Sequence, residues 1–234
     1  GEIAILGFCE DFGLAREIAA RPLVYDEHTL CLAKKYDAEV FVKINTGVNR
    51  LGFSTIGETA SAVKNLRVLG EFTHLSSADG DDATDRRITE AQIKNFMEAE
   101  LVVKNEKDVP FYAENSAALI KYGRFFDGAR IGIALYGVNP VSGDKTPLLP
   151  VMTFRAAVIA INTVKKGDFI GYSRGYRAKK DMRVAIISTG YADGLPRALS
   201  NKGMIFCNRQ FLKIVGKVSM DRVAVDAGDA DVKI

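Results

Sequence analysis

The sequence has few of the residues that build metal centres and disulfide frameworks, since its 234 residues include three cysteines and two histidines. Cys9, Cys31 and Cys207 are odd in number and form no Cys-x-x-Cys pair, which argues against both a disulfide framework and a zinc site. With only His28 and His74 available, we expect no histidine-rich centre and no bound metal. Such cysteine usage is typical of a reducing compartment, so we predict a cytoplasmic location.

A long apolar run and an excess of one charge are also missing. No stretch of about 18 apolar residues and no signal-peptide pattern occur, so we expect no membrane contact from this segment. Lys and Arg total 32 against 29 Asp and Glu, and the two signs are interspersed. Because no basic stripe alternates with aromatic residues, a nucleic-acid partner is not expected.

Apolar residues make up 47% of the sequence, which is enough for one sizeable hydrophobic core or two unequal ones. Over residues 1–135, short apolar runs alternate with amphipathic stretches, which predicts a parallel sheet with crossover helices. The predicted strands are Ile3–Leu6, Leu23–Tyr25, Val40–Ile44, Val68–Leu75, Phe111–Ala113 and Ala129–Ile131.

Six βα units fit an open doubly wound sheet, whereas a closed barrel uses eight units and roughly 250 residues. The chain opens directly in a strand at Gly1 to Ile3, so we expect that about 80 residues, two units, precede it in an incomplete (β/α)8 barrel. A linker-like passage lies between Pro140 and Pro150, and β-like runs such as Val184–Ser188 follow it. We therefore predict a partial barrel over 1–146 and an all-β domain over 147–234.

Three short motifs occur in order in the second half: Gly171-Tyr172-Ser173, then Gly190-Tyr191-Ala192-Asp193-Gly194, then Met220-Asp221. Tyrosine beside glycine suits a sharp bend from which a phenol projects into a site. A single tyrosine of this kind is more often a half-buried sheet residue whose hydroxyl is exposed to solvent. The three together resemble the carboxy-terminal domain of the alanine racemase family, in which the first tyrosine is a catalytic acid/base.

A loop from Lys43 to Phe53 follows the third predicted strand. On spacing alone it would be a solvated loop with two surface cations. It resembles the family's "lysine–hydrophobic–aspartate–threonine–glycine–methionine–x–arginine–leucine–glycine" segment, with Asn45 and Val48 in place of the acid and the methionine. The resemblance implies that Arg50 binds the phenolic oxygen of the cofactor and the substrate carboxylate, a task for a planar donor fork. Lys43, often carbamylated in the family, would support Arg50.

Two further strings resemble family motifs that surround the cofactor ring. His74, a structural histidine on spacing alone, lies in a Thr-His-Leu string similar to the family's "threonine–histidine–phenylalanine–alanine". Arg130 begins a string similar to "arginine–proline–glycine–isoleucine–x–x–tyrosine–glycine", with Ile131 in place of proline. The resemblance implies that Arg130 contacts the pyridine nitrogen of pyridoxal 5'-phosphate (PLP). The backbone amides at Gly132 and Ile133 would cradle the phosphate.

Glu114-Asn115-Ser116 follows the fifth predicted strand and opens a helix. Asn115 or Ser116 could be a simple N-cap, which is compatible with an anion site at the helix start. In the family the matching serine contacts the phosphate and the asparagine lies beside the cofactor. Glu114 departs from the small residue usual there.

The resemblance covers nearly the whole chain and implies a PLP-dependent amino-acid racemase. Its expected reaction interconverts L-alanine and D-alanine, a peptidoglycan precursor, by two-base proton transfer on the external aldimine of PLP. We expect a homodimer in which the β-domain of one subunit completes the site of the other. Tyr172 would take the proton of the L-enantiomer, with His74 and Arg130 behind it. Arg50 and the Met220 backbone amide would hold the carboxylate of the small amino-acid substrate. Tyr191 and Asp221 would line the entrance to the site.

Three alternatives stay open at this point. A serine or broad-specificity racemase, including a membrane-tethered one, differs in a few pocket residues. A PLP-binding homologue without turnover is favoured modestly by the departures at Asn45, Val48, Ile131 and Ser173. An open-sheet nucleotide-binding protein has little support, because the chain has no GxGxxG string.

The lysine that carries PLP in the family lies in a "lysine–alanine–asparagine–alanine–tyrosine–glycine" string that we do not find here. A family tyrosine that contacts the phosphate would lie beyond Ile234. We therefore expect that this chain by itself does not racemise amino acids.

Overall fold

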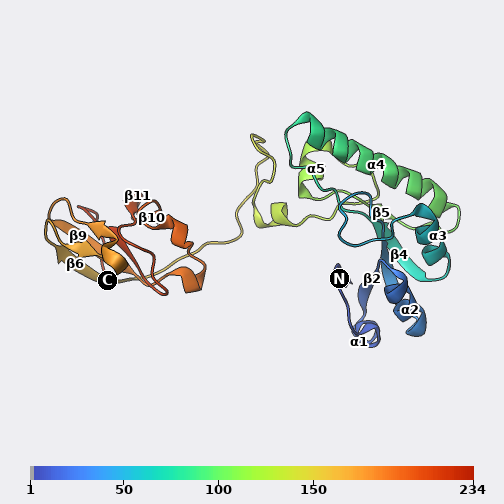
Figure 1. The fold of residues 1–234 in the computed structure, drawn as a ribbon, viewed down its shortest axis with the longest axis horizontal. Coiled ribbons are helices and arrows are strands. Elements are labelled where there is room, and N and C mark those ends of the chain that lie inside the picture. The colour runs from blue at the N-terminus through green and yellow to red at the C-terminus, as the bar shows by residue number, and fades with distance from the viewer. Residues whose placement is uncertain (1–2) are drawn as a thin grey trace. The chain divides into compact units, whose positions relative to one another are not determined.

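The computed structural model describes residues 3–234, so Gly1 and Glu2, where the predicted first strand opens, lie outside the described residues. The chain forms two compact units that divide between Met152 and Thr153 (Figure 1). In the first unit, five parallel strands lie in sequential order, β1-β2-β3-β4-β5, and helices connect them. Its elements are β1 (Ile3–Ile5), α1 (Phe12–Glu17), β2 (Ala20–Val24), α2 (Glu27–Lys35), β3 (Glu39–Lys43), α3 (Ile56–Lys64), β4 (Arg67–Phe72), α4 (Ala83–Lys104), β5 (Phe111–Tyr112), α5 (Ser116–Tyr122) and the 3₁₀ turn η1 (Ile133–Tyr136).

The helices of this unit begin where polar side chains cap them. Asp26 before α2 and Thr55 before α3 each form a capping box with the third residue of the helix, Thr29 and Glu58 respectively. Asp82 caps the 22-residue helix α4 by accepting from the Asp85 amide. These local signals fix the helix starts and hence the lengths of the loops that precede them.

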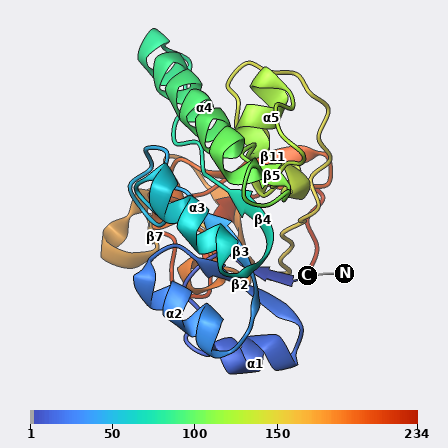
Figure 2. The same cartoon turned by 90° about the vertical axis from the view of Figure 1, so that its right-hand side faces the viewer.

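The two faces of the sheet differ. One face carries Val40 and Val42, which are fully buried in the core beneath the helices, and Figure 2 shows α2, α3 and α4 along this side. The other face carries Phe41, whose ring packs 5.8 Å from Phe72 and 6.4 Å from Tyr112. The sheet curls as an incomplete (β/α) barrel, which confirms the predicted fold class. Barrel sites form at the carboxyl ends of the strands, so the loops after β3, β4 and β5 are the ones to examine.

The prediction of a sixth strand at Ala129–Ile131 is wrong. Within residues 3–234, the sheet continues beyond β5 only as an isolated parallel bridge between Tyr112 and Gly128. A Cβ at Gly128 would come within 2.9 Å of the Tyr112 ring, so glycine lets the segment lie close to β5. The Arg130 amide then donates to the Glu114 carbonyl at 2.8 Å, which takes the chain out of the sheet.

The second unit is built from short antiparallel strands, as the sequence predicts, around small apolar clusters centred on residues such as Val184, Ile214 and Val225. Strands β12, β9 and β6 form one sheet, and β7–β8 and β10–β11 are two-stranded ribbons. The strands are β6 (Val158–Val164), β7 (Phe169–Ile170), β8 (Tyr176–Arg177), β9 (Met182–Ile187), β10 (Met204–Cys207), β11 (Gln210–Lys213) and β12 (Val223–Asp226), and the 3₁₀ turns are η2 (Tyr172–Arg174), η3 (Tyr191–Asp193) and η4 (Arg197–Leu199). Across the described residues of both units, no helix is long and apolar enough to cross a membrane.

Candidate active site

The loop after β3 is a tight structure stabilised by its own polar side chains. The side-chain oxygen of Asn45, Oδ1, accepts hydrogen bonds from the backbone amides of Gly47 at 3.1 Å and Asn49 at 2.9 Å. Gly52 has φ +127°, and a Cβ there would lie 2.6 Å from the Asn45 nitrogen, so only glycine fits. Asn45 therefore forms the turn although it replaces the acid expected from the family.

Lys43, the last residue of β3, is buried, whereas Arg50 in the same loop is exposed. Burial lowers the pKa of Lys43 to about 8, and the charges of Arg50 and Arg130 add to the effect. These three cations thus lie close enough to interact. Such a cluster favours a bound anion.

His74 and Arg130 are brought together from segments 56 residues apart. The Arg130 Nη2 atom lies 3.4 Å from His74 Nδ1 and donates a second bond to the Thr73 carbonyl. The guanidinium also lies over the Phe72 ring, 4.7 Å from its centroid. The Arg130 guanidinium therefore contacts the residues at and just after the end of β4.

This arrangement sets the protonation of both groups. Burial lowers the pKa of His74 to about 4, helped by the charges of Arg130, Arg50 and Lys43. Burial also lowers the pKa of Arg130 to about 10, which leaves it charged at neutral pH. Since a guanidinium can only donate, His74 Nδ1 must accept, and the imidazole proton resides on Nε2. The neutral His74 thus has a donor that faces away from Arg130.

A buried polar network beneath these residues escaped the sequence analysis. Thr46 and Thr73 share a hydrogen bond of 2.7 Å, and Gln92 of α4 donates to Thr46 at 3.3 Å and to the His74 carbonyl at 3.1 Å. The Gln92 oxygen accepts from the amide and the hydroxyl of Ser76, each at 2.9 Å. The sequence signal for this network is Gln92, which lies next to Ile93 on the buried face of α4. A buried side-chain amide needs hydrogen-bond partners, so this glutamine indicates that polar groups lie opposite it.

Ser116 and Gly132 form a cradle beside this cluster. The Ser116 hydroxyl accepts from the amides of Gly132 at 3.1 Å and Ala134 at 3.2 Å. Asn115 caps α5 through the Ala118 amide and donates to the Leu75 carbonyl at 3.1 Å. A Cβ at Gly132 would meet nothing within 4 Å, so the space in front of this backbone is open.

These residues line one cavity of about 730 Å³ in the first unit. Of the predicted site residues, it brings together six: His74, Asn115, Ser116, Arg130, Gly132 and Ile133. Lys43 and Arg50 do not line the cavity, but their charges help to lower the pKa of His74, which does. Among the described residues no cluster of three His, Cys, Asp or Glu side chains could hold a metal ion. The cavity therefore offers a cationic, donor-rich site for an anion-bearing organic ligand.

In the second unit, Tyr172 stands on a strained bend. Gly171 has φ +76°, and Ser173 and Arg174 have φ of 53° and 55°, values that L-residues rarely adopt. A Cβ at Gly171 would approach the Lys217 amide at 3.2 Å, so the bend packs tightly on the following segment. The Tyr172 side chain is 72% exposed, as expected of a phenol that projects from its own unit.

The other two motifs of this unit meet through backbone hydrogen bonds. The Tyr191 amide donates to the Ser219 carbonyl at 3.0 Å, and the Ala192 amide donates to the Met220 carbonyl at 2.9 Å. Tyr191 is half-exposed beneath the Arg197 guanidinium, 5.5 Å from the ring centroid. Asp221 is exposed and lies 3.8 Å from Arg222. Tyr191, Met220 and Asp221 thus share one edge of the β unit.

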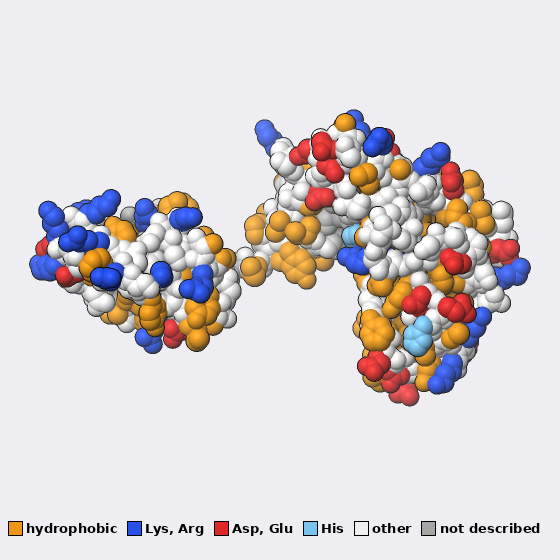
Figure 3. Space-filling model, viewed as in Figure 1, with side chains coloured by type: hydrophobic (Ala, Val, Ile, Leu, Met, Phe, Trp, Pro, Cys, Tyr) orange, Lys and Arg blue, Asp and Glu red, His pale blue; other side chains and the backbone are white. Residues whose placement is uncertain are grey.

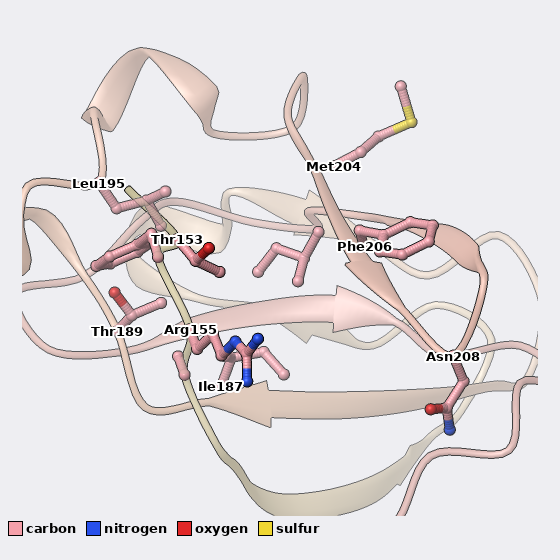
Figure 4. Close-up of a pocket in the computed structure, with 11 residues that line it drawn as sticks. Thr153, Arg155, Ile187, Thr189, Leu195, Met204, Phe206 and Asn208 are labelled. Atoms are coloured by element: carbon pink, nitrogen blue, oxygen red, sulfur yellow. The ribbon is translucent and has the colours of Figure 1, made fainter. Parts of the chain in front are cut away.

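A second cavity, of about 760 Å³, lies within the β unit and contains none of the predicted residues (Figure 4). It is lined mainly by apolar side chains such as Ile187, Leu195 and Phe206. The buried Thr189 hydroxyl there has no hydrogen-bond partner. Without a charged cluster like that around Arg130, this cavity is not the candidate active site.

A curled parallel sheet, a donor-rich cavity at the carboxyl ends of its strands and a separate β unit define an α/β-barrel protein with a small-molecule site at the barrel end. Two family models match the chain: alanine racemase, N-terminal domain, over residues 1–140 and alanine racemase, C-terminal domain, over residues 151–234. The chain belongs to the alanine racemase family.

Individual relatives agree with this assignment. An alanine racemase of Sorangium cellulosum (strain So ce56) is 35% identical over 231 residues, which cover 91% of this chain and 60% of the relative. An amino-acid racemase of Enterococcus faecalis is 35% identical over 97% of this chain and 34% of its own length. The crystal structure of the Bartonella henselae alanine racemase with covalently bound pyridoxal phosphate superposes with a TM-score of 0.81 at 28% identity, covering 99% of this chain and 67% of that one. The chain thus spans about 60% of the length of the curated Sorangium relative.

Proposed function

We propose that this chain provides the cofactor-binding cavity and one of the two proton-transfer groups of a PLP-dependent racemase that interconverts L- and D-alanine. The observation that carries the proposal is the convergence of Arg130, His74 and Ser116 on one cavity. Family membership supports the activity, because the similar proteins are alanine racemases.

The residues around the cavity fit PLP. The Ser116 hydroxyl and the Ile133 amide would hold the phosphate in the open space where a Cβ at Gly132 would project, while the Gly132 amide orients Ser116 by donating to its hydroxyl. Arg130, whose buried Nε has no partner, would face the pyridine nitrogen and keep it unprotonated, since a charged guanidinium does not give up its proton. When bound, PLP delocalises the electron pair that is left when the α-proton is removed.

The residues of this chain would then orient the substrate and move one proton. Arg50 and the Met220 amide would bind the substrate carboxylate, while Lys43 supports Arg50 from β3. Tyr172 would remove the proton from the L-enantiomer. A phenol has an ordinary pKa near 10, so Tyr172 needs the Nε2–H of His74 and the nearby cations to stabilise its phenolate. The opposite face of the substrate requires a second base, which we assign to the family's lysine outside this chain.

We further propose a cytoplasmic homodimer in which Tyr172, Tyr191 and Asp221 of one subunit complete the cavity of its partner. The high exposure of Tyr172 supports this, because a catalytic phenol needs a surrounding that its own unit does not provide. The product would be D-alanine, a peptidoglycan precursor.

Loss of deuterium from α-deuterated alanine tests the proposed function in a protein that includes this chain and the preceding segment. With PLP added, we expect wash-out from both enantiomers into water. If neither enantiomer loses deuterium, the chain is a PLP-binding homologue without turnover and the proposal fails.

A serine or broad-specificity racemase is the second candidate, favoured by the 35% identity to the Enterococcus amino-acid racemase. The same wash-out assay with α-deuterated serine in competition with alanine separates the two candidates. Preference for serine by tenfold or more in kcat/KM would reassign the substrate.

A further inference from the structure

Glu114 is a fully buried carboxylate between β5 and α5. Its Oε1 atom accepts hydrogen bonds from the backbone amides of Phe125 and of Phe126, the latter at 3.0 Å. Its backbone carbonyl accepts from the Arg130 amide at 2.8 Å. One residue therefore binds both ends of the segment 125–130.

Between these two ends, the segment lies against β5. The Asp127 amide donates to the Phe111 carbonyl at 3.0 Å, and the Asp127 carboxylate accepts from the Phe111 amide at 2.8 Å. These bonds hold the middle of the segment. The Glu114 side chain binds the point at which the segment enters, and the Glu114 backbone carbonyl binds the point at which it leaves.

The exit of this segment determines where the Arg130 side chain can reach. From there the guanidinium contacts the Thr73 carbonyl, His74 Nδ1 at 3.4 Å and the Phe72 ring. A shift of 1 Å at the Arg130 backbone would break a contact that is already at the limit of hydrogen-bond distance. The negative charge of Glu114 also favours the charged state of Arg130.

We propose that Glu114 is a positioning residue: it braces the segment 125–130 and thereby holds Arg130 against His74. The importance of this contact for catalysis rests on the proposed racemase function. The hydrogen bonds of Glu114 themselves form in the chain without cofactor. Glu114 contacts neither substrate nor cofactor in this account and acts only through Arg130.

Two variants separate the hydrogen bonds of the brace from its charge. Glu114→Gln keeps a carbonyl oxygen at the same reach, so it can still accept from Phe125 and Phe126 but carries no charge. Glu114→Asp keeps the charge but is one methylene shorter, so its carboxylate no longer reaches both amides. The control is Glu71→Gln, which alters another fully buried carboxyl group, one that pairs in register with Val42 in the sheet.

The readout is the NMR titration of His74 in the chain without cofactor, with the chain's one other histidine, His28, as internal reference. In the unmodified chain, burial lowers the pKa of His74 to about 4, and the charge of Arg130 adds to the effect. We expect Glu114→Asp to raise it by about one unit or more, because Arg130 moves away. Glu114→Gln and Glu71→Gln should leave it unchanged.

An unchanged His74 pKa in Glu114→Asp would contradict the proposal. So would a changed His74 pKa in Glu114→Gln, because either result would show that the length of the side chain does not determine the position of Arg130. If Glu114→Asp fails to fold, amide hydrogen exchange in the unmodified chain decides. Protected amides at Phe125 and Phe126 support the brace, and rapid exchange at both overturns it. Binding of PLP is measured separately by absorbance. Absence of binding would count against the proposed function and leave the result for the brace unaffected.

Discussion

Glu71 and His74 are three residues apart near the end of β4, and burial shifts their pKa values in opposite directions. Burial lowers the pKa of His74 to about 4 and raises the pKa of Glu71 to about 8, since each is driven towards its neutral form. His74 has partners, but neither carboxyl oxygen of Glu71 has one. Glu71 therefore lowers the stability of the fold, whereas His74 lines the cavity of the candidate site.

We predict that Glu71→Gln stabilises the first unit at alkaline pH. Glu71 takes up a proton on folding between its ordinary pKa near 4.5 and about 8, so the free energy of unfolding must fall as pH rises through this window. Relative to Glu71→Gln, the unmodified chain should lose roughly 1.5 kcal/mol of unfolding free energy between pH 6.5 and 8, because the contributions of His74 and Lys43 are common to both proteins and cancel in the difference. Urea unfolding of the two proteins at each pH measures this difference. Parallel profiles for the two proteins would contradict the account.

At the residue scale, the sequence motifs point to residues that lie together in the fold, and the roles of these residues stay predictions. The motif strings around His74, Ser116, Arg130 and Gly132 led to residues that line one cavity. The departure at Asn45 proved compatible with the turn, because an amide oxygen can accept the two backbone bonds. The partners of Gln92 could not be foreseen, since they depend on how α4 packs across two strand ends.

At the scale of elements, α4 joins the loops after β3 and β4 through Gln92. Replacing Gln92 with Leu keeps the volume but leaves Thr46, Ser76 and the His74 carbonyl with fewer partners. We expect a loss of about 2 kcal/mol in the free energy of unfolding, the cost of leaving buried polar groups unpaired. Chemical denaturation measures it, with Glu90→Ala on the exposed face of α4 as the matched control. Equal small losses of under about 0.5 kcal/mol in both variants would mean that the network is not stabilising.

Hydrophobic patterning predicted the elements that have their own caps or alternate clearly between faces. It failed at Ala129–Ile131, an apolar run that reads as a strand. There the tight packing of Gly128 on Tyr112 and the bond from the Arg130 amide to Glu114 override the local pattern. Such tertiary contacts join distant segments and have no signature within the run itself.

At the scale of the whole molecule, the two units carry opposite net charge. Residues 153–234 contain 15 Lys and Arg against 7 Asp and no Glu, a net charge of +8, and residues 1–152 contain 17 basic against 22 acidic residues, a net charge of −5. Figure 3 shows Lys and Arg side chains spread over the visible face of the β unit. Opposite charges favour docking of the β unit of one copy on the first unit of another, which supports the proposed shared site.

The central claim is that Tyr172 of the β unit serves one face of the substrate at a cavity organised by Arg130 and His74. Its most direct test is Tyr172→Phe in a protein that includes the preceding segment, with the rates of α-deuterium loss from L- and D-alanine measured separately. The account predicts that loss from L-alanine slows by about a hundredfold or more while loss from D-alanine is much less affected. Equal slowing for the two enantiomers would contradict it.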